Sequence, residues 1–217
     1  MSTRLDYRRG LELHATTIDR LHTCLKGALA AACAQRQGEV YRAYARRTND
    51  GSAKGFDNLL NAIWDDIRYA RVSEQEHRKW NDQAEKLYPI KKGTTDRCRA
   101  GAELAVLSLL YSNDVLGSGK TQYTIDAAHQ TFGSIEHFLT SSIGQKPQFK
   151  MYHPEANAKV LAHPLTEAEH CRQERDLFDL EQALLRPDTM ADFVNRLRKR
   201  AEIEAKIFLP IFDGSMA

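Results

Sequence analysis

The feature that most constrains the fold is a helical hydrophobic period that runs through most of the chain. Its clearest instance is the stripe Phe56, Leu59, Leu60, Ile63, Trp64 and Ile67, in which apolar residues recur three and four positions apart. Side chains at this spacing lie on one face of an α-helix and are buried against other elements. The alternation of apolar and polar residues that is typical of a strand is not found. The sequence therefore predicts an all-α protein.

Capping signals and turn residues divide this pattern into a single bundle of about six or seven helices. Ser73 with Glu76 forms one capping box, and a glycine at position 38 marks the end of the first long helix. The helix expected over 96–116 is apolar on most of its circumference, which places it at the centre of the bundle. We expect residues 1–217 to form one domain, with an N-terminal helical region over 1–50, a core over 56–185 and a last helix over 188–209.

The segment from His163 to Leu185 combines a helix start with charged residues. Thr166 occupies an N-cap position, and Glu169 three residues later closes a capping box. Spacings of about seven residues predict a stripe that faces the core, namely Cys171, Leu177, Phe178, Leu184 and Leu185. The same phase leaves the charged side chains largely in solvent, namely Arg172, Arg175, Asp176 and Asp179.

Composition argues against several classes of function. The formal net charge of +2 gives no strong field for nucleic acid or an anionic membrane. The longest apolar run, 100–111, is shorter than the roughly 20 residues of a membrane span, and the N-terminus lacks the apolar segment of a secretory signal. The four cysteines are scattered, without a C-x-x-C pair. We expect a cytoplasmic protein that binds no specific nucleic acid, no membrane and no cofactor.

The string GSGKT at 117–121 resembles the end of a phosphate-binding loop. The complete motif requires glycine where this chain has Asp114, and it requires a strand before the loop where the periodicity predicts a helix. We therefore interpret Gly117 and Gly119 as residues that let the chain turn from one helix into the next.

Two Glu-x-x-His pairs supply an alternative hypothesis, a metal-dependent helical enzyme or metal-binding protein. Bundles that hold two metal ions use two such pairs with a glutamate from each of two other helices. The matching residues here are Glu74, His77, Glu103, Glu136, Glu167 and His170. Both pairs lie near the start of their predicted helices, where acidic residues are favoured without any metal. Our main interpretation therefore includes no metal and no catalytic residue.

A long connection over 144–164, together with the helix after it, is the expected partner-binding surface. Aromatic side chains and arginines are enriched at the centres of protein interfaces. The candidates are Phe149, Lys150, Tyr152, Arg172 and Arg175. The alternative is that the two aromatic residues pack back onto the bundle and anchor the connection.

The order of motifs between Phe56 and Leu185 resembles the YjaG-like bacterial family, an all-helical group of unknown function. The resemblance rests on the LNAIWD sequence ending at Asp65, the LYP helix end at 87–89, the alanine-rich helix near 100–116, and an HPL…E…Q..DL pattern from His163 to Leu177. Proteins of this kind are similar to helical immunity proteins encoded beside bacterial toxins. The resemblance thus implies a non-enzymatic antitoxin that binds and neutralises a cognate protein toxin. A homodimer is left open.

Overall fold

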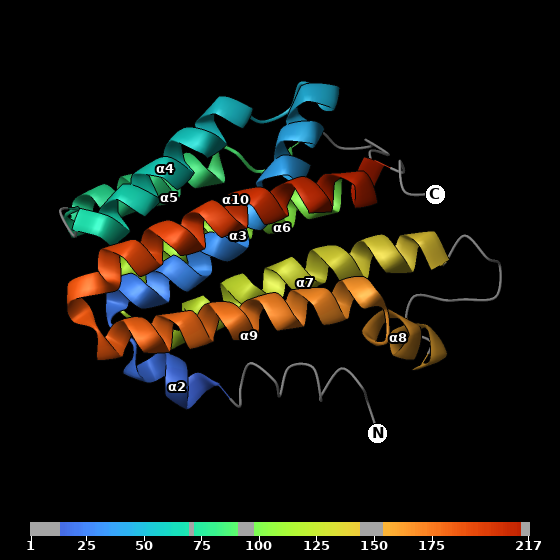
Figure 1. Ribbon diagram of the computed structural model, residues 1–217. Coiled ribbons are helices and arrows are strands. Elements are labelled where there is room, and N and C mark those ends of the chain that lie inside the picture. The colour runs from blue at the N-terminus through green and yellow to red at the C-terminus, as the bar shows by residue number, and fades with distance from the viewer. Residues whose placement is uncertain (1–13, 70–71, 91–97, 144–153, 214–217) are drawn as a thin grey trace.

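The computed structural model describes residues 14–69, 72–90, 98–143 and 154–213, and these residues form helices without any strand. The predicted all-α class is confirmed. The α-helices shown in Figure 1 are α2 (Ala15–Arg20), α3 (Thr23–Thr48), α4 (Ala53–Tyr69), α5 (Glu74–Glu85), α6 (Arg99–Ser118), α7 (Thr121–Ile143), α8 (Pro154–Leu161), α9 (Pro164–Leu185) and α10 (Met190–Asp213), with a 3-10 turn at Pro187–Thr189. Among the helices described, none is long and apolar enough to cross a membrane.

Helix α3 lies at the centre of the bundle. It contacts α4, α6, α7, α9 and α10, and its residues are buried without interruption from Leu25 to Gly38. The prediction that the helix over 96–116 is central is wrong, because α6 buries one side and leaves Glu103 and Leu104 partly exposed. Hydrophobicity alone does not identify the central helix of this bundle, because α3 combines small residues with polar residues that form hydrogen bonds and ion pairs inside the protein.

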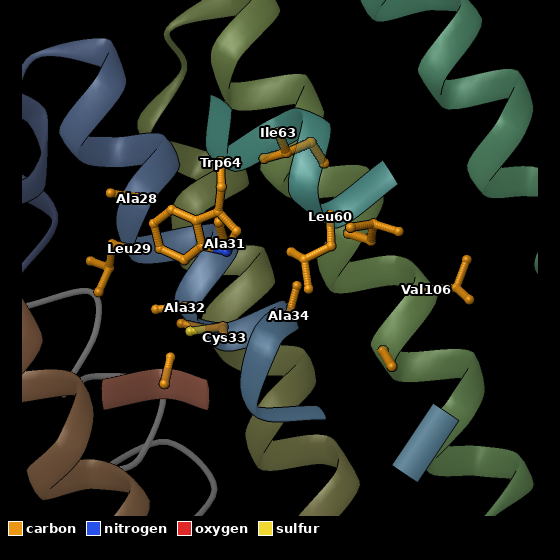
Figure 2. Packing of buried hydrophobic residues seen from close by; sticks show 14 of the residues in the cluster. Ala28, Leu29, Ala31, Ala32, Cys33, Ala34, Leu60, Ile63, Trp64 and Val106 are labelled. Atoms are coloured by element: carbon orange, nitrogen blue, oxygen red, sulfur yellow. The ribbon is translucent and has the colours of Figure 1, made fainter. Parts of the chain in front are cut away.

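Small side chains let the neighbouring helices approach α3 closely. Figure 2 shows Ala28, Ala31, Ala32 and Ala34 of α3 near Trp64 and neighbouring apolar residues of α4. Gly27 of the same helix lies so close to α6 that a Cβ atom there would be only 2.5 Å from Cδ2 of Leu116. Dense packing of this kind is typical of protein interiors, so the alanine-rich sequence of α3 is a packing feature.

The predicted break at Gly38 is wrong, because α3 continues through this glycine to Thr48. A glycine inside a helix costs roughly 1 kcal/mol relative to alanine, which tertiary packing can offset. A Cβ at Gly38 would lie 3.4 Å from the ring of Phe56, and that ring stacks on Tyr41 with centroids 4.6 Å apart. The helix ends instead at Asn49, which adopts the left-handed conformation with φ of 52°.

Local helix signals are confirmed at two places. The predicted stripe of α4 is buried in full, and Ser73 caps α5, with its Oγ accepting a hydrogen bond from the Glu76 amide at 3.3 Å. The capping box predicted at Thr166 is wrong. Helix α9 starts earlier, at Pro164, and His163 is its N-cap residue. The Thr166 hydroxyl instead donates to the carbonyl of Val160 at 2.6 Å.

The GSGKT string has the turning role that the sequence predicts. Gly117 lies inside α6, and Gly119 ends that helix in the left-handed conformation with φ of 70°. Thr121 opens α7, and its hydroxyl donates to Asp19 at 2.7 Å. The residues of the phosphate-loop-like string therefore join two helices.

Alanine substitutions at the two glycines test this assignment. Gly119→Ala should lower the free energy of unfolding by about 1 to 2 kcal/mol, because a Cβ is disfavoured in the left-handed region. Gly117→Ala is the matched control: a Cβ there would make an ordinary 3.6 Å contact with His77 and remove backbone freedom from the unfolded chain. It should leave stability equal or higher in chemical denaturation. Equal losses from the two substitutions would contradict the assignment.

Candidate interaction surface

The structure does not bring together the six residues nominated for metal binding. Three of them pair with residues of their own helices, Glu74 with Arg78, Glu103 with Arg99 and His170 with Glu174. Glu167 is exposed and Glu136 is half-buried. Within the described ranges, no three histidine, cysteine, aspartate or glutamate side chains are arranged to hold a metal ion. The geometry of these residues gives the metal hypothesis no support.

His77, one of those six, is a buried tie between three helices. Its Nδ1 lies 2.7 Å from Oδ1 of Asn113, and the Asn113 amide donates back to the His77 carbonyl at 2.7 Å. Its Nε2 lies 3.5 Å from a carboxylate oxygen of Asp66. The imidazole thereby joins α5 to α6 and α4, and a buried polar group satisfied in this way stabilises packing.

Helix α9 buries Asp176, one of the four charged residues predicted to lie in solvent, while Arg175 is exposed as predicted and Arg172 and Asp179 are half-buried. Its buried residues are Thr166, Glu169, Gln173, Asp176, Leu177, Leu180 and Ala183. Of the predicted core stripe, only Leu177 is buried. Cys171 and Leu184 are exposed, and Phe178 and Leu185 are 58% and 75% exposed. The predicted core stripe is wrong, because Glu169 and Asp176 of α9 face a cation on α3.

That cation is Arg36, which is wholly buried near the middle of α3. Its Nη1 atom donates to Asp176 at 2.7 Å, and its Nη2 lies 3.1 Å from Glu169. The carboxylate of Glu204, on α10, lies 3.6 Å from Nη1. Because an isolated charge in a protein interior is very costly, these three carboxylates are what permits a guanidinium at this position.

An outer set of arginines balances the excess negative charge. Arg200 donates to Asp176 at 2.6 Å and to Asp179 at 2.7 Å, and Arg175 donates to Glu204 at 2.5 Å. Arg172 lies 3.4 Å from Glu169. The resulting charge network contains Arg36, Arg172, Arg175, Arg200, Glu169, Asp176, Asp179 and Glu204, so its formal charges cancel. It links α3, α9 and α10.

Burial and neighbouring charges together shift the pKa values of the groups in this network. Burial alone would lower the pKa of the Arg36 guanidinium, but the carboxylates of Glu169 and Asp176 hold that pKa well above its usual value. Burial raises the pKa of the Glu169 carboxyl, and the opposing effect of Arg36 is smaller. Burial likewise raises the pKa of the neighbouring Cys33 thiol to about 12. A thiol with this pKa is not an activated nucleophile.

The predicted partner-binding residues therefore divide into two groups. Phe149, Lys150 and Tyr152 lie outside the described residues. Arg172 and Arg175 are described, and both belong to the charge network; Arg172 is half-buried, whereas Arg175 is also exposed to solvent. The outward-facing side chains of α9 are a different set, which includes Phe178 and Leu185.

Helix α10 presents a surface that the sequence analysis did not single out. Its exposed residues include a set of cations and isoleucines, with the exposed Glu202 between them paired to Arg198: Arg196, Lys199, Ile203, Lys206 and Ile207. We call this set the α10 stripe. Neither lysine forms an ion pair with the residues that the structure describes, and the Arg196 guanidinium lies 4.3 Å from the centroid of the Phe193 ring. The exposed Ile203 and Ile207 distinguish the α10 stripe from a purely charged, solvated helix face.

No protein-family model and no curated protein matches this sequence. The fold is similar to the crystal structure of a DUF416 family protein from Shewanella baltica OS155, with a TM-score of 0.72 and 16% sequence identity. The similarity covers 86% of this chain and 92% of that chain. The two proteins thus share their fold over most of both chains, and the family of the Shewanella protein is uncharacterised.

Neutralising Arg36 tests the charge network. Arg36→Met should lower the free energy of unfolding by about 3 to 5 kcal/mol, because it leaves buried carboxylates without their central cation. Arg42→Met is the matched control on the same helix, where a partly exposed arginine pairs with Glu39 and Asp57. It should cost roughly 1 kcal/mol. Urea denaturation measures both, and a loss at Arg36 no larger than that at Arg42 would contradict the role given to the network.

Proposed function

We propose that this protein is a non-enzymatic immunity protein, an antitoxin that binds a cognate protein toxin and neutralises it. The observation that carries the proposal is the α10 stripe, in which exposed isoleucines lie among cations that have no carboxylate partner within the described part of the chain. Arginine and large apolar side chains are enriched at protein interfaces, and complementary charge guides partners together. The proposal therefore assigns the toxin an acidic surface.

Ion pairs within the chain distinguish the other arginines of α10 from the cations of the α10 stripe. Arg198 pairs with Glu202 at 3.2 Å and donates to Asn61, and Arg200 is held by Asp176 and Asp179. These inward and lateral arginines have found their partners within the chain. Lys199 and Lys206 form no ion pair with any residue that the structure describes, which supports a partner supplied by another molecule.

The charge network supports binding by holding the stripe in place. Arg175 and Arg200 each join α9 to α10, and Arg36 joins both helices to α3. A surface that is ordered before binding loses less conformational entropy when the partner docks. The arrangement thus supports a rigid recognition surface.

The reactive groups seen in the structure are also consistent with a binding role. Cys33 has its pKa raised to about 12 by burial, and burial followed by the charge of Asp66 raises the pKa of Cys24. His77 is held in hydrogen bonds between helices. An antitoxin needs no reactive side chain, because covering the toxin's active site is sufficient.

Co-expression tests the proposal directly. The protein should protect cells from the product of the neighbouring gene in its native genome and should copurify with it. Lys199→Glu and Ile203→Asp should each weaken the purified complex roughly tenfold or more, measured by titration calorimetry, because the first reverses a contact charge and the second places a charge in an apolar contact.

Lys79→Glu is the matched control for charge reversal, since Lys79 is an exposed lysine on α5 that already pairs with Glu76. It should leave affinity nearly unchanged. A complex weakened equally by the control would show that net charge, rather than the α10 stripe, governs binding. If the neighbouring gene product is neither bound nor neutralised, the immunity function is wrong.

A further inference from the structure

The outward face of α9 carries a line of apolar side chains that nothing in the chain covers within the described residues. Cys171, Phe178 and Leu185 are exposed and follow one another at intervals of seven residues. Positions seven apart fall on nearly the same side of an α-helix. We call these three residues the α9 line. In Figure 1, α9 lies beside α10 with α3 behind them, so the α9 line faces away from the core.

Two exposed charged residues beside the α9 line are arranged symmetrically about Phe178, while a third, Glu174, has the neutral Gln182 as its counterpart. Arg175 lies three residues before Phe178, and Glu181 lies three residues after it. Cys171 and Leu185 lie seven residues before and after it. An antiparallel copy of the helix, related by a two-fold axis at Phe178, would therefore place arginine against glutamate twice and the outer apolar residues against each other.

A parallel arrangement has the opposite consequence. It would place Arg175 against Arg175 and Glu181 against Glu181, and like charges directly across a helix contact are destabilising. The sequence of the exposed face is thus complementary to itself in the antiparallel direction only. Arg175 keeps its bond to Glu204 and, at 42% side-chain exposure, still has donors directed to solvent.

We propose that a second copy of this chain covers the α9 line, forming a two-fold symmetric dimer through antiparallel packing of α9 on α9. Phe178 of each copy lies at the axis, and two Arg175 to Glu181 pairs flank it. Such an interface is isologous, which closes at two subunits and buries the same surface on both. The proposal concerns α9 and does not depend on the antitoxin function assigned to α10.

Sedimentation of the purified chain tests the proposal in the absence of any toxin. The wild-type protein should sediment as a reversible dimer, and Phe178→Asp should raise the dimer dissociation constant at least about tenfold by placing two carboxylates at the axis. Because Phe178 is largely exposed, the variant should keep the wild-type fold, which its far-UV circular dichroism spectrum checks. Ile90→Asp, at another exposed apolar residue, is the matched control and should remain dimeric.

Disulfide cross-linking tests the register. Cys171 is the exposed thiol among cysteines that are otherwise buried or half-buried. In the proposed dimer the two Cys171 residues are about 21 Å apart along the helix axis, too far for a disulfide, so the wild type should not cross-link under mild oxidation. Leu185→Cys puts a thiol opposite Cys171 of the other copy and should give a cross-linked dimer.

Three results would overturn the proposal. The first is a wild-type chain that is monomeric at every accessible concentration. The second is a dimer that survives Phe178→Asp with unchanged affinity. The third is a wild-type dimer that cross-links through Cys171 as readily as the Leu185→Cys variant, which would require a different register.

Discussion

A single buried guanidinium determines how the outer layer of this protein is built. Arg36 lies on the central helix, where water does not reach it, and its charge must be balanced by carboxylates from elsewhere in the chain. Glu169 and Asp176 come from α9, and Glu204 comes from α10. Since all three must point inward, the rotation of both helices about their axes is fixed. Phe178 on α9 is directed outward as a consequence.

The same constraint decides which residues are available for binding. The predicted contacts Arg172 and Arg175 belong to the network, and of these two only Arg175 also lies at the edge of a proposed surface, the one on α9. The orientation of the two proposed surfaces, on α9 and α10, thus depends on the buried charge of Arg36, although none of their residues touches Arg36. A preordered surface of this kind loses less conformational entropy when a partner docks.

Sequence reasoning succeeded where the signal is local. The stripe of α4, the Ser73 cap and the turn at Gly119 each depend on residues within a few positions of one another. It failed for α9, because the partner that draws Asp176 inward is Arg36, 140 positions away. Apolar periodicity assumes that the core is apolar, so a helix that buries its acidic face is assigned the wrong phase. For the same reason the sequence does not distinguish Arg200 of α10, which pairs with Asp176, from the neighbouring exposed Lys199.

Hydrogen exchange of the Asp176→Asn variant, followed helix by helix, tests the central claim most directly. The substitution keeps the shape of the side chain and removes the charge that pairs with Arg36 and Arg200. If the network holds the outer layer on α3, amides of α9 and α10 should lose protection while those of α6 and α7 keep it. Equal loss of protection in all four helices, or no loss in any, would contradict the account.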